Sequence, residues 1–240
     1  MLSARNAGGR LLLRVEDLDR GRARDDVAEA QREDLRWLGI DWDDETPPQS
    51  QRAYSLYGIP TYRCACNREV RLARRCRCRE KDAGQGAWRF RTPPGLVSFT
   101  DRACGLKALV PEDDPILMRA DGEAAYPLAV VVDDARDGVT EVVRGADLLE
   151  ATSTQIRLHE VLGLASPSYL HVPVLLGPDG KKLSKSHGSS EIRALRAAGF
   201  TAQRVWDTLL PWLGIAPGPL SHARLDPARI PPGPRIGICL

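Results

Sequence analysis

A short basic and hydroxyl-rich segment carries the side chains best suited to chemistry in this sequence. It reads Lys181-Lys182-Leu183-Ser184-Lys185-Ser186 and follows the apolar run 172–176 and the turn 177–180. Ammonium and hydroxyl groups on a glycine-flanked loop can hold the phosphates of a nucleotide while charge develops on them. A solvated basic loop has the same composition, so the motifs elsewhere in the chain must decide between these two interpretations.

An acidic group follows the first apolar run, 11–15, and comprises Glu16, Asp17 and Asp19. Carboxylates at the carboxyl end of a buried strand face the ligand crevice of an open α/β sheet, where they can bind an ammonium group or a ribose hydroxyl. Asp17 and Asp19 fit a structural role equally well, as caps of the turn that leads to the next helix. Strand alternation points Glu16 away from the direction of Asp17, which makes Glu16 the better binding candidate.

Two more polar residues lie at the ends of predicted strands. Tyr126 begins the run 126–132, and Arg144 ends the run 140–144. Each could extend a polar tip into a shared crevice, and an arginine at a strand end can clamp a carboxylate with two parallel hydrogen bonds. Core packing of Tyr126 and a surface ion pair between Arg144 and Asp147 are the structural alternatives.

The elements that must position these residues alternate between strands and helices. Apolar runs predict strands over 11–15, 126–132, 140–144 and 172–176, and helical spacing predicts helices over 25–38, 152–162, 191–198 and 204–213. Residues from Pro217 onward are rich in proline and glycine and are expected to form loop. This alternation predicts an α/β fold in which polar loops follow buried parallel strands.

Composition narrows the class of protein. The 240 residues are 42% hydrophobic, which is ample for a buried core. No apolar run approaches the ~20 residues of a membrane span. Residues 1–6 lack the apolar core of a signal peptide, so we expect a cytoplasmic protein without membrane contact.

One stretch of the chain is strongly basic although the formal net charge is only +2. Within it, only Glu69 opposes the arginines at 63, 68, 71, 74, 75, 77 and 79. Such a cluster fits phosphate contacts with RNA, and it fits a solvated helix face equally well.

Four cysteines lie in the same stretch, as Cys64-Ala65-Cys66 and Cys76-Arg77-Cys78. A reducing compartment disfavours disulfides, and four thiolates can close a tetrahedral structural zinc site. We therefore predict that Cys64, Cys66, Cys76 and Cys78 bind Zn²⁺. Cys104 and Cys239 stand alone and are expected to be ordinary thiols.

Several motifs, taken in order, resemble the glutamyl-tRNA synthetase group of class I aminoacyl-tRNA synthetases. They are R-V-E-D-L-D, D-L-R-W-L-G-I-D-W-D, Y-P-L-A-V-V-V-D-D, V-V-R-G-A-D-L-L, Y-L-H-V-P-V-L-L and K-K-L-S-K-S, and they cover most of the chain outside residues 55–115. The chain is too short for the family's helical anticodon-binding domain, so it resembles the truncated branch. The resemblance then implies activation of L-glutamate with ATP and transfer to the queuosine base at the wobble position of tRNA(Asp).

The resemblance also assigns roles to particular residues. It makes Glu16 the partner of the glutamate amino group, with Tyr126 and Arg144 as further glutamate-binding residues. Lys185 becomes the catalytic, ATP-contacting lysine, in a loop whose other nucleotide-binding residues are Lys182, Ser184 and Ser186. ATP would be used with Mg²⁺. The family's zinc pattern has a tyrosine near the position of Cys76, which makes Cys78 the more secure ligand of that pair.

Domain boundaries follow from the resemblance together with the shifts in composition. Residues 1–54 and 116–188 are expected to form a Rossmann-like catalytic domain. Residues 55–115 are expected to form an inserted zinc and acceptor-binding subdomain, and residues 189–240 a helical C-terminal part. We expect a monomer.

The resemblance further implies a glycine-rich strand and an H-I-G-H motif ahead of Met1. We therefore expect Met1 to be an internal methionine of a longer reading frame. Two other interpretations stay open: a non-catalytic module that binds RNA or glutamate, and a glutamyl-tRNA synthetase catalytic fragment that acts with a separate anticodon domain.

Overall fold

The computed structural model describes residues 1–19, 21, 23–65, 78, 82–111, 114–176 and 191–231, together with the backbone of 235–237. The predicted nucleotide-binding residues Lys182, Ser184, Lys185 and Ser186 lie outside these ranges, as do Cys66 and Cys76. In the described part of the chain, no helix is long and apolar enough to cross a membrane.

Helices and strands alternate through much of the described chain. The helices are α1 (Leu2–Asn6), α2 (Asp25–Trp37), α3 (Tyr126–Arg136), α4 (Ala151–Leu162), α5 (Ile192–Ala197) and α6 (Ala202–Leu209). The strands are β1 (Leu12–Arg14), β2 (Asp44–Thr46), β3 (Thr61–Cys64), β4 (Ala87–Phe90), β5 (Val97–Asp101), β6 (Gly105–Leu109), β7 (Ile116–Met118), β8 (Glu141–Gly145), β9 (Ser168–Val172), β10 (Val174–Leu176) and β11 (Arg235–Gly237).

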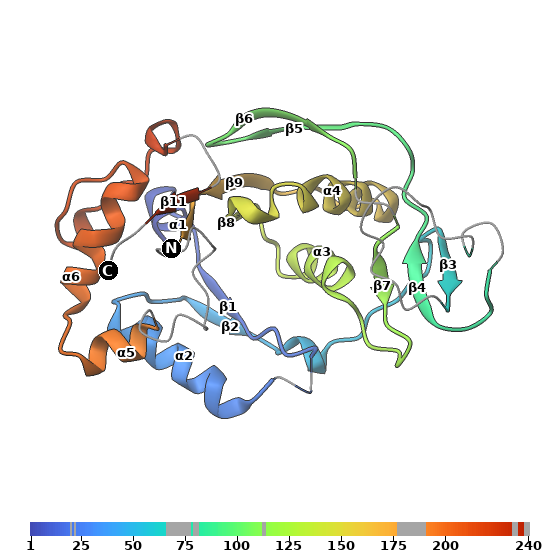
Figure 1. Cartoon of the computed structure of the whole chain (residues 1–240), viewed down its shortest axis with the longest axis horizontal. Coiled ribbons are helices and arrows are strands. Elements are labelled where there is room, and N and C mark those ends of the chain that lie inside the picture. Colours follow the sequence, from blue (N-terminus) through green and yellow to red (C-terminus); the bar gives the residue numbers. More distant parts are fainter. Residues whose placement is uncertain are drawn as a thin grey trace.

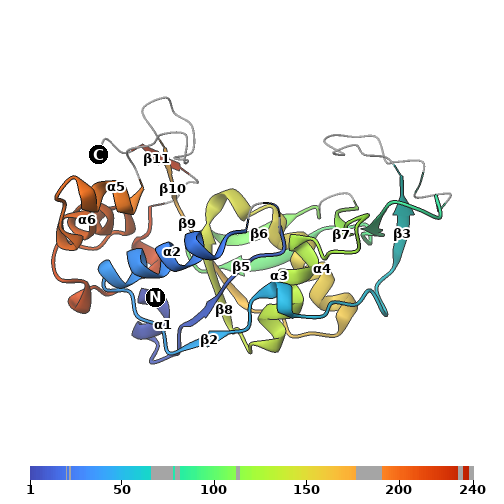
Figure 2. The ribbon, with the colours of Figure 1, turned by 90° about the horizontal axis from the view of Figure 1, so that it is seen from below.

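The strands form several small sheets (Figure 1). β1 and β2 pair in parallel, and a four-stranded sheet has the order β6-β5-β9-β8, in which β8 and β9 are parallel. β3, β4 and β7 form an antiparallel sheet at one end of the elongated molecule, whereas α5 and α6 lie at the other end (Figures 1 and 2). The predicted α/β organisation with parallel strand pairs is confirmed.

The described part of the predicted insertion is attached to the rest of the fold by strand pairing. β4 pairs with β7, which begins at Ile116, one residue beyond the predicted boundary. The β5–β6 hairpin joins the parallel pair β8–β9 in the four-stranded sheet, because Asp101 of β5 pairs with Tyr169 of β9. Strands from the predicted insertion therefore pair with strands that follow position 115 in two of the sheets.

One predicted strand is wrong. The run that begins at Tyr126 forms helix α3, with Ala125 as its N-cap and Pro127 in its first turn. Proline is favoured at that position because the missing N–H would have no partner there. Three consecutive valines favour a strand locally, but the helix buries Leu128, Val130 and Val131, and tertiary packing outweighs their propensity.

The C-terminal tail also differs from the expectation of loop throughout. It contains two short 3-10 turns, Leu220–His222 and Pro227–Arg229, and the strand β11. β11 pairs in parallel with β10, with Ile236 opposite Leu175. A neighbouring strand supplies hydrogen-bond partners that the tail's own composition does not reveal.

Three apolar clusters are found among the described residues, and two of them bear on the candidate site and on the C-terminal helices. The larger joins α3 and α4 to β4 and β7 through the fully buried side chains of Leu128, Leu158, Phe90 and Leu117. A second cluster joins the end of α2 to α5 and α6 through side chains that include Leu38. Burial of such side chains contributes about 1.5–3 kcal/mol each, so α3 is held firmly where its first residue meets the candidate site.

Candidate active site

Arg144, in β8, is held by polar contacts on two of its three guanidinium nitrogens. Its Nε donates to Nε2 of His171 at 3.1 Å, and its Nη2 donates to Oγ1 of Thr152 at 2.7 Å. Nη2 also donates to the carbonyl oxygen of Leu148 at 3.3 Å. The guanidinium carbon lies 5.6 Å from the centre of the Tyr169 ring. None of these hydrogen bonds uses Nη1, so this nitrogen of the guanidinium group can make other contacts.

Tyr126 lies at the first position of α3 and is 41% exposed, which does not fit the alternative of core packing. Burial raises the pKa of its hydroxyl, Arg144 lowers it, and the negative charge of Glu16 raises it. The net direction is upward, so the phenol is neutral at pH 7. Charges on both Arg144 and Glu16 thus act on this one hydroxyl, and the fold brings the three predicted glutamate-binding residues together.

Glu16 lies two residues beyond the end of β1, with 48% of its side chain exposed. Its Oε1 is 3.8 Å from Nη2 of Arg14. Burial raises the pKa of the Glu16 carboxyl, and the Arg14 charge partly offsets this. The site therefore presents an anion, a cation and a neutral phenol, which complement the ammonium and carboxylate groups of an amino acid.

Asp17 has a structural role, but not the expected one of capping the turn that leads to α2, because its carboxylate contacts Ser50 instead. Its Oδ1 accepts from the backbone N of Ser50 at 2.7 Å, and its Oδ2 accepts from the Ser50 hydroxyl. These contacts tie the loop after β1 to the 3-10 turn Gln49–Gln51 (η1), and the turn supports the loop that carries Glu16.

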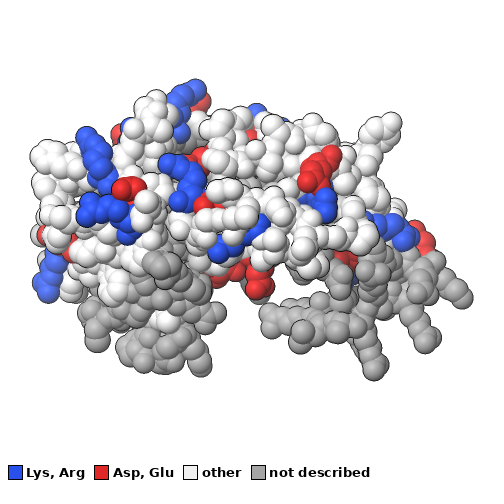
Figure 3. Space-filling view, turned by 90° about the horizontal axis from the view of Figure 1, so that it is seen from above, with Lys and Arg blue, Asp and Glu red and all other residues white. Residues whose placement is uncertain are grey.

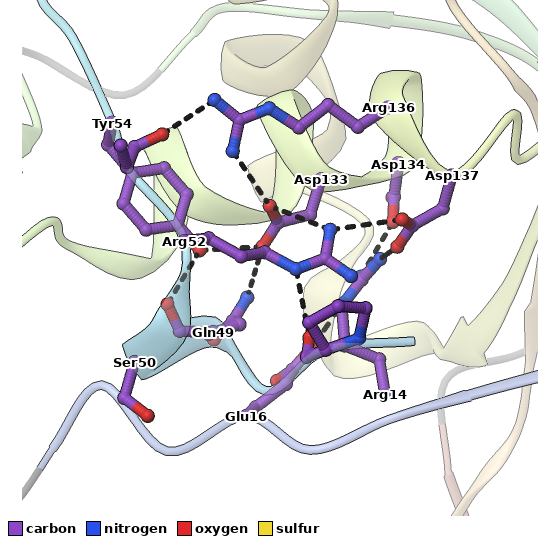
Figure 4. A network of polar contacts seen from close by, with 12 residues as sticks. Arg14, Glu16, Gln49, Ser50, Arg52, Tyr54, Asp133, Asp134, Arg136 and Asp137 are labelled. Atoms are coloured by element: carbon purple, nitrogen blue, oxygen red, sulfur yellow. Dashed lines mark hydrogen bonds and ion pairs between the residues drawn. The ribbon is translucent and has the colours of Figure 1, made fainter. Parts of the chain in front are cut away.

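A buried polar network joins this loop region to α3 (Figure 4). Asp133, whose side chain is fully buried, accepts from Nε2 of Gln49 at 2.9 Å and from the Tyr54 hydroxyl at 2.8 Å. Nη1 of Arg52 lies 3.2 Å from Oδ1 of Asp133 and 3.0 Å from Oδ1 of Asp137. These contacts set the distance between the β1–β2 unit and the helix that carries Tyr126.

Arg14 makes a second bridge between the same two parts of the fold. Its Nη2 donates to Asp134 at 2.7 Å, and its Nη1 donates to Asp137 at 2.8 Å. The Arg14 side chain is 14% exposed, and such charge-assisted pairs are stronger and more directional than neutral hydrogen bonds. The contacts of Arg14 with Asp134 and Asp137 therefore also fix the backbone that carries Glu16, two residues further along the chain.

Comparison with known proteins assigns this arrangement to a family. The family model described as tRNA synthetases class I (E and Q), catalytic domain, matches residues 1–69 and 63–217. The chain belongs to this family. It is a member of the aminoacyl-tRNA synthetase class of ligases.

The chain is also similar to individual curated synthetases. It is 40% identical over 268 residues to the glutamyl-Q tRNA(Asp) synthetase of Nitratidesulfovibrio vulgaris, with 94% of this chain and 82% of the relative covered. It is 39% identical over 283 residues to the glutamyl-Q tRNA(Asp) synthetase of Symbiobacterium thermophilum, with 97% of this chain and 87% of the relative covered. A glutamate–tRNA ligase of Oleidesulfovibrio alaskensis is 39% identical over 253 residues, with 94% of this chain and 54% of the relative covered.

Solved structures show the same fold. A glutamate tRNA ligase from Elizabethkingia meningosepticum, crystallised with its amino acid, superposes with a TM-score of 0.63 at 24% identity. The superposition covers 83% of this chain and 48% of that one, so the chain spans about half the length of that ligase.

The synthetase's predicted zinc ligands are only partly described. Cys64 ends β3 and is buried, and Cys78 is half-buried, whereas Cys66 and Cys76 lie outside the described ranges. Among the described side chains, no group of three or more Cys, His, Asp or Glu residues is arranged to hold a metal ion. The thiolate chemistry of the four cysteines fits zinc, and zinc binding stays a proposal.

Of the predicted arginine cluster, Arg63 is described and the arginines from 68 to 79 are not. Arg63 lies with its guanidinium carbon 4.6 Å from the centre of the Trp88 ring. On the face drawn in Figure 3, basic and acidic side chains are interspersed. A phosphate-binding role of the cluster therefore remains a prediction.

Two hollows open in the described surface. One of about 1160 Å³ opens between β1 and α2 and includes Glu16 in its lining. Another of about 810 Å³ lies between α1, α2 and α6. Tyr126 and Arg144 line neither hollow, so the site is defined by the convergence of its charged groups.

Three residues that surround Arg144, namely Asp101, Thr152 and His171, were not among the candidates selected from the sequence. His171 lies inside the motif Y-L-H-V-P-V-L-L, and Thr152 begins a predicted helix close behind Arg144, so both could have been considered. Asp101 had no such signal, because it lies 70 positions from the histidine that it contacts.

Proposed function

We propose that this chain activates L-glutamate with ATP to form glutamyl-adenylate and transfers the glutamyl group to queuosine at the wobble position of tRNA(Asp). The observation that carries the proposal is the placement of an anion, Glu16, and a cation, Arg144, around the Tyr126 hydroxyl. The names of relatives that are about 40% identical over most of the chain support the same substrates.

The charges suit the amino acid's two ends. The Glu16 carboxylate accepts hydrogen bonds from the glutamate ammonium group, and the Arg144 guanidinium donates to a glutamate carboxylate. The Tyr126 hydroxyl, on which both charges act, can contact either group. A Lys in place of Arg144 would keep the charge but lose the fork that engages His171 and Thr152.

Adenylate formation needs no side-chain nucleophile. An α-carboxylate oxygen of glutamate forms a bond to the α-phosphorus of ATP, and the bond from that phosphorus to the pyrophosphate oxygen breaks. Catalysis then consists of positioning and of stabilising phosphate charge. Lys185 is proposed for that second task, together with Lys182, Ser184 and Ser186 and with Mg²⁺ on the phosphates.

The division of the chain into domains is proposed from its membership of the synthetase family. Residues 55–115 form the zinc and acceptor-binding insertion between catalytic segments 1–54 and 116–188, and residues 189–240 form the C-terminal part of a monomer. A structural metal would organise the segment around Cys64 and Cys78. Metal analysis of freshly purified, reduced protein should find one zinc per chain, and a metal-free, folded protein would contradict this.

ATP–pyrophosphate exchange tests the activation step. Exchange should depend on L-glutamate and not on L-aspartate or L-glutamine. Lys185→Ala should slow it by roughly 100-fold, the effect of losing one well-placed donor. Arg144→Lys should raise the KM for glutamate, whereas Arg119→Lys, an exposed arginine paired with Asp121, serves as the matched control. Full exchange in Lys185→Ala would remove this lysine from the mechanism.

The acceptor distinguishes the remaining candidates. Glutamylation of queuosine-containing tRNA(Asp) supports the proposal, and charging of tRNA(Glu) supports the glutamate–tRNA ligase activity named for another relative. Glutamate or RNA binding without exchange would favour a binding module. Charge reversal at Arg71, Arg74 and Arg75 should weaken RNA binding and leave glutamate activation unchanged.

A further inference from the structure

His171 occupies a buried position directly behind Arg144. It lies in β9, opposite Arg144 of β8 in the parallel register, and its side chain is fully buried. We propose that His171 orients Arg144 for glutamate, and that it does so only as the neutral imidazole with its proton on Nδ1. The proposal rests on the proposed role of Arg144 in binding glutamate and adds His171 and Asp101 as positioning residues.

Asp101 decides which nitrogen of His171 carries the proton. Its Oδ2 lies 2.6 Å from Nδ1 of His171, and its Oδ1 accepts from the backbone N of Cys104 at 2.8 Å and of Ala103 at 3.0 Å. Burial raises the pKa of Asp101, but the hydrogen bonds from His171 and from these backbone groups outweigh it and leave the pKa below its usual value. Asp101 is therefore an ionised acceptor, so Nδ1 must donate.

Nε2 of His171 must then act as an acceptor. Nε of Arg144 always carries hydrogen and donates to this nitrogen at 3.1 Å. Thr152 completes the arrangement, because its Oγ1 accepts from Nη2 of Arg144 and lies 3.2 Å from Nε2 of His171. The guanidinium plane is held on two sides, which directs the Nη1 edge away from His171 and Thr152.

Protonation of His171 would reverse this contact. The charged groups that act on its ring are Asp101 from β5, Arg144 from β8 and Asp147 from the 3-10 turn Ala146–Leu148 (η3). Tyr169 of the same strand stacks on the ring with centroids 6.2 Å apart, and the thiol of Cys104 lies 4.0 Å from the His171 carbonyl oxygen. A second proton would place an N–H donor and a positive charge against the Nε–H of Arg144, so the hydrogen bond between these two nitrogens would be lost and the proton on Nε2 could turn only to Oγ1 of Thr152, at 3.2 Å.

The pKa of His171 agrees in direction with the neutral state. Burial lowers it, the Arg144 charge lowers it further, and Asp101 and Asp147 only partly offset these effects. The imidazole is therefore neutral at pH 7, and glutamate affinity should fall as the pH drops through a value below 6.5, the ordinary pKa of histidine.

Two substitutions separate the two nitrogens of His171. In His171→Asn the amide can still donate to Asp101 but cannot reach Arg144. In His171→Gln the amide oxygen can replace Nε2 as the acceptor for Arg144. We expect the Kd for L-glutamate, measured by isothermal titration calorimetry, to rise roughly 10- to 100-fold in His171→Asn, as for loss of a hydrogen bond to a charged group. In His171→Gln the Kd should return close to the wild-type value. Because glutamine does not titrate, the affinity of this variant should not fall as the pH drops below 6.5.

His159→Asn is the matched control, because His159 is also a buried histidine, at 2% exposure, and makes no contact with Arg144 among the hydrogen bonds described above. Its Kd for glutamate should equal that of the wild type. Equal affinities of folded His171→Asn and wild type, or equal losses in His171→Asn and His171→Gln, would overturn the proposal.

Nitrogen-15 NMR of the unmodified chain tests the same inference without any ligand. His171 should show a protonated Nδ1 and an unprotonated Nε2 at pH 7, and the Nε–H resonance of Arg144 should shift in His171→Asn but not in His159→Asn. The reverse tautomer or a doubly protonated ring would overturn the positioning role. A correct NMR result without glutamate binding would instead contradict the proposed function.

Discussion

Substitution of Asp133 by asparagine should weaken the joint between the β1–β2 unit and α3. The Asp133 side chain is fully buried and lies 3.2 Å from the Arg52 guanidinium, whose side chain is 7% exposed. Asparagine keeps the size of the side chain and removes its charge. The arginine charge then loses one of its two buried partners, while the second, Asp137 at 3.0 Å, remains.

The remaining partner sets the magnitude. Removal of one member of a buried ion pair typically costs about 3–5 kcal/mol, because the other charge is left uncompensated. Asp137 continues to pair with Arg52, so we expect the lower end, about 3 kcal/mol. For a chain of this size each kcal/mol lowers the Tm by roughly 2–4 °C, which gives a decrease of about 6–12 °C.

Urea denaturation followed by far-UV circular dichroism measures this change. Asp121→Asn is the control, because it removes a carboxylate from an exposed pair with Arg119, and exposed pairs contribute about 0–1 kcal/mol. If Asp133→Asn changed the free energy of unfolding by no more than the control does, the network would not be a stabilising joint and the reasoning would be refuted.

Other substitutions and pH test further parts of the fold. Gly86→Ala should destabilise more than Gly84→Ala in urea, because both glycines have positive φ, +91° and +68°, but only at Gly86 would a Cβ lie 2.3 Å from a backbone carbonyl of β3. Leu128→Ala should cost about 2–5 kcal/mol of unfolding free energy by leaving a cavity, and Leu106→Ala, at 75% exposure, less than about 0.5; similar values would contradict the core assignment. Burial lowers the pKa of His159, so below pH 6.5 the unfolded chain takes up a proton that the folded chain does not. The free energy of unfolding should therefore decrease as the pH is lowered, by at most about 1.4 kcal/mol per pH unit. His159→Asn should make this decline shallower, and an unchanged slope would mean that His159 is not the group responsible.

Local pattern predicted several elements correctly. The helix expected over 25–38 is found at Asp25–Trp37, and the one expected over 152–162 at Ala151–Leu162. Both carry apolar residues at helical spacing, a signal that tertiary contacts reinforce. The strand expected at 140–144 is found at Glu141–Gly145 for a similar reason, since its short apolar run pairs on one side with β9.

The segment that starts at Tyr126 shows where local pattern fails. Three adjacent valines favour a strand by propensity, yet the segment is a helix because it packs against α4 and β7 and places Asp133 and Asp137 on one face. The identity of Tyr126 as a candidate did not depend on this error, because a residue at either the start of a strand or the start of a helix can face the same crevice.

The sequence by itself determined the chemistry available: an acidic loop after a strand, an arginine at a strand end, a tyrosine before an apolar run and the order of motifs that places the chain among class I synthetases. Only the tertiary structure decided that Glu16 and Arg144 act on one phenol and that Asp101 supports Arg144 through His171. The partners of His171, Arg144 and Asp101, lie 27 and 70 positions from it in the chain. Contacts over such separations depend on strand register and on packing of distant elements, which no local pattern of residues specifies.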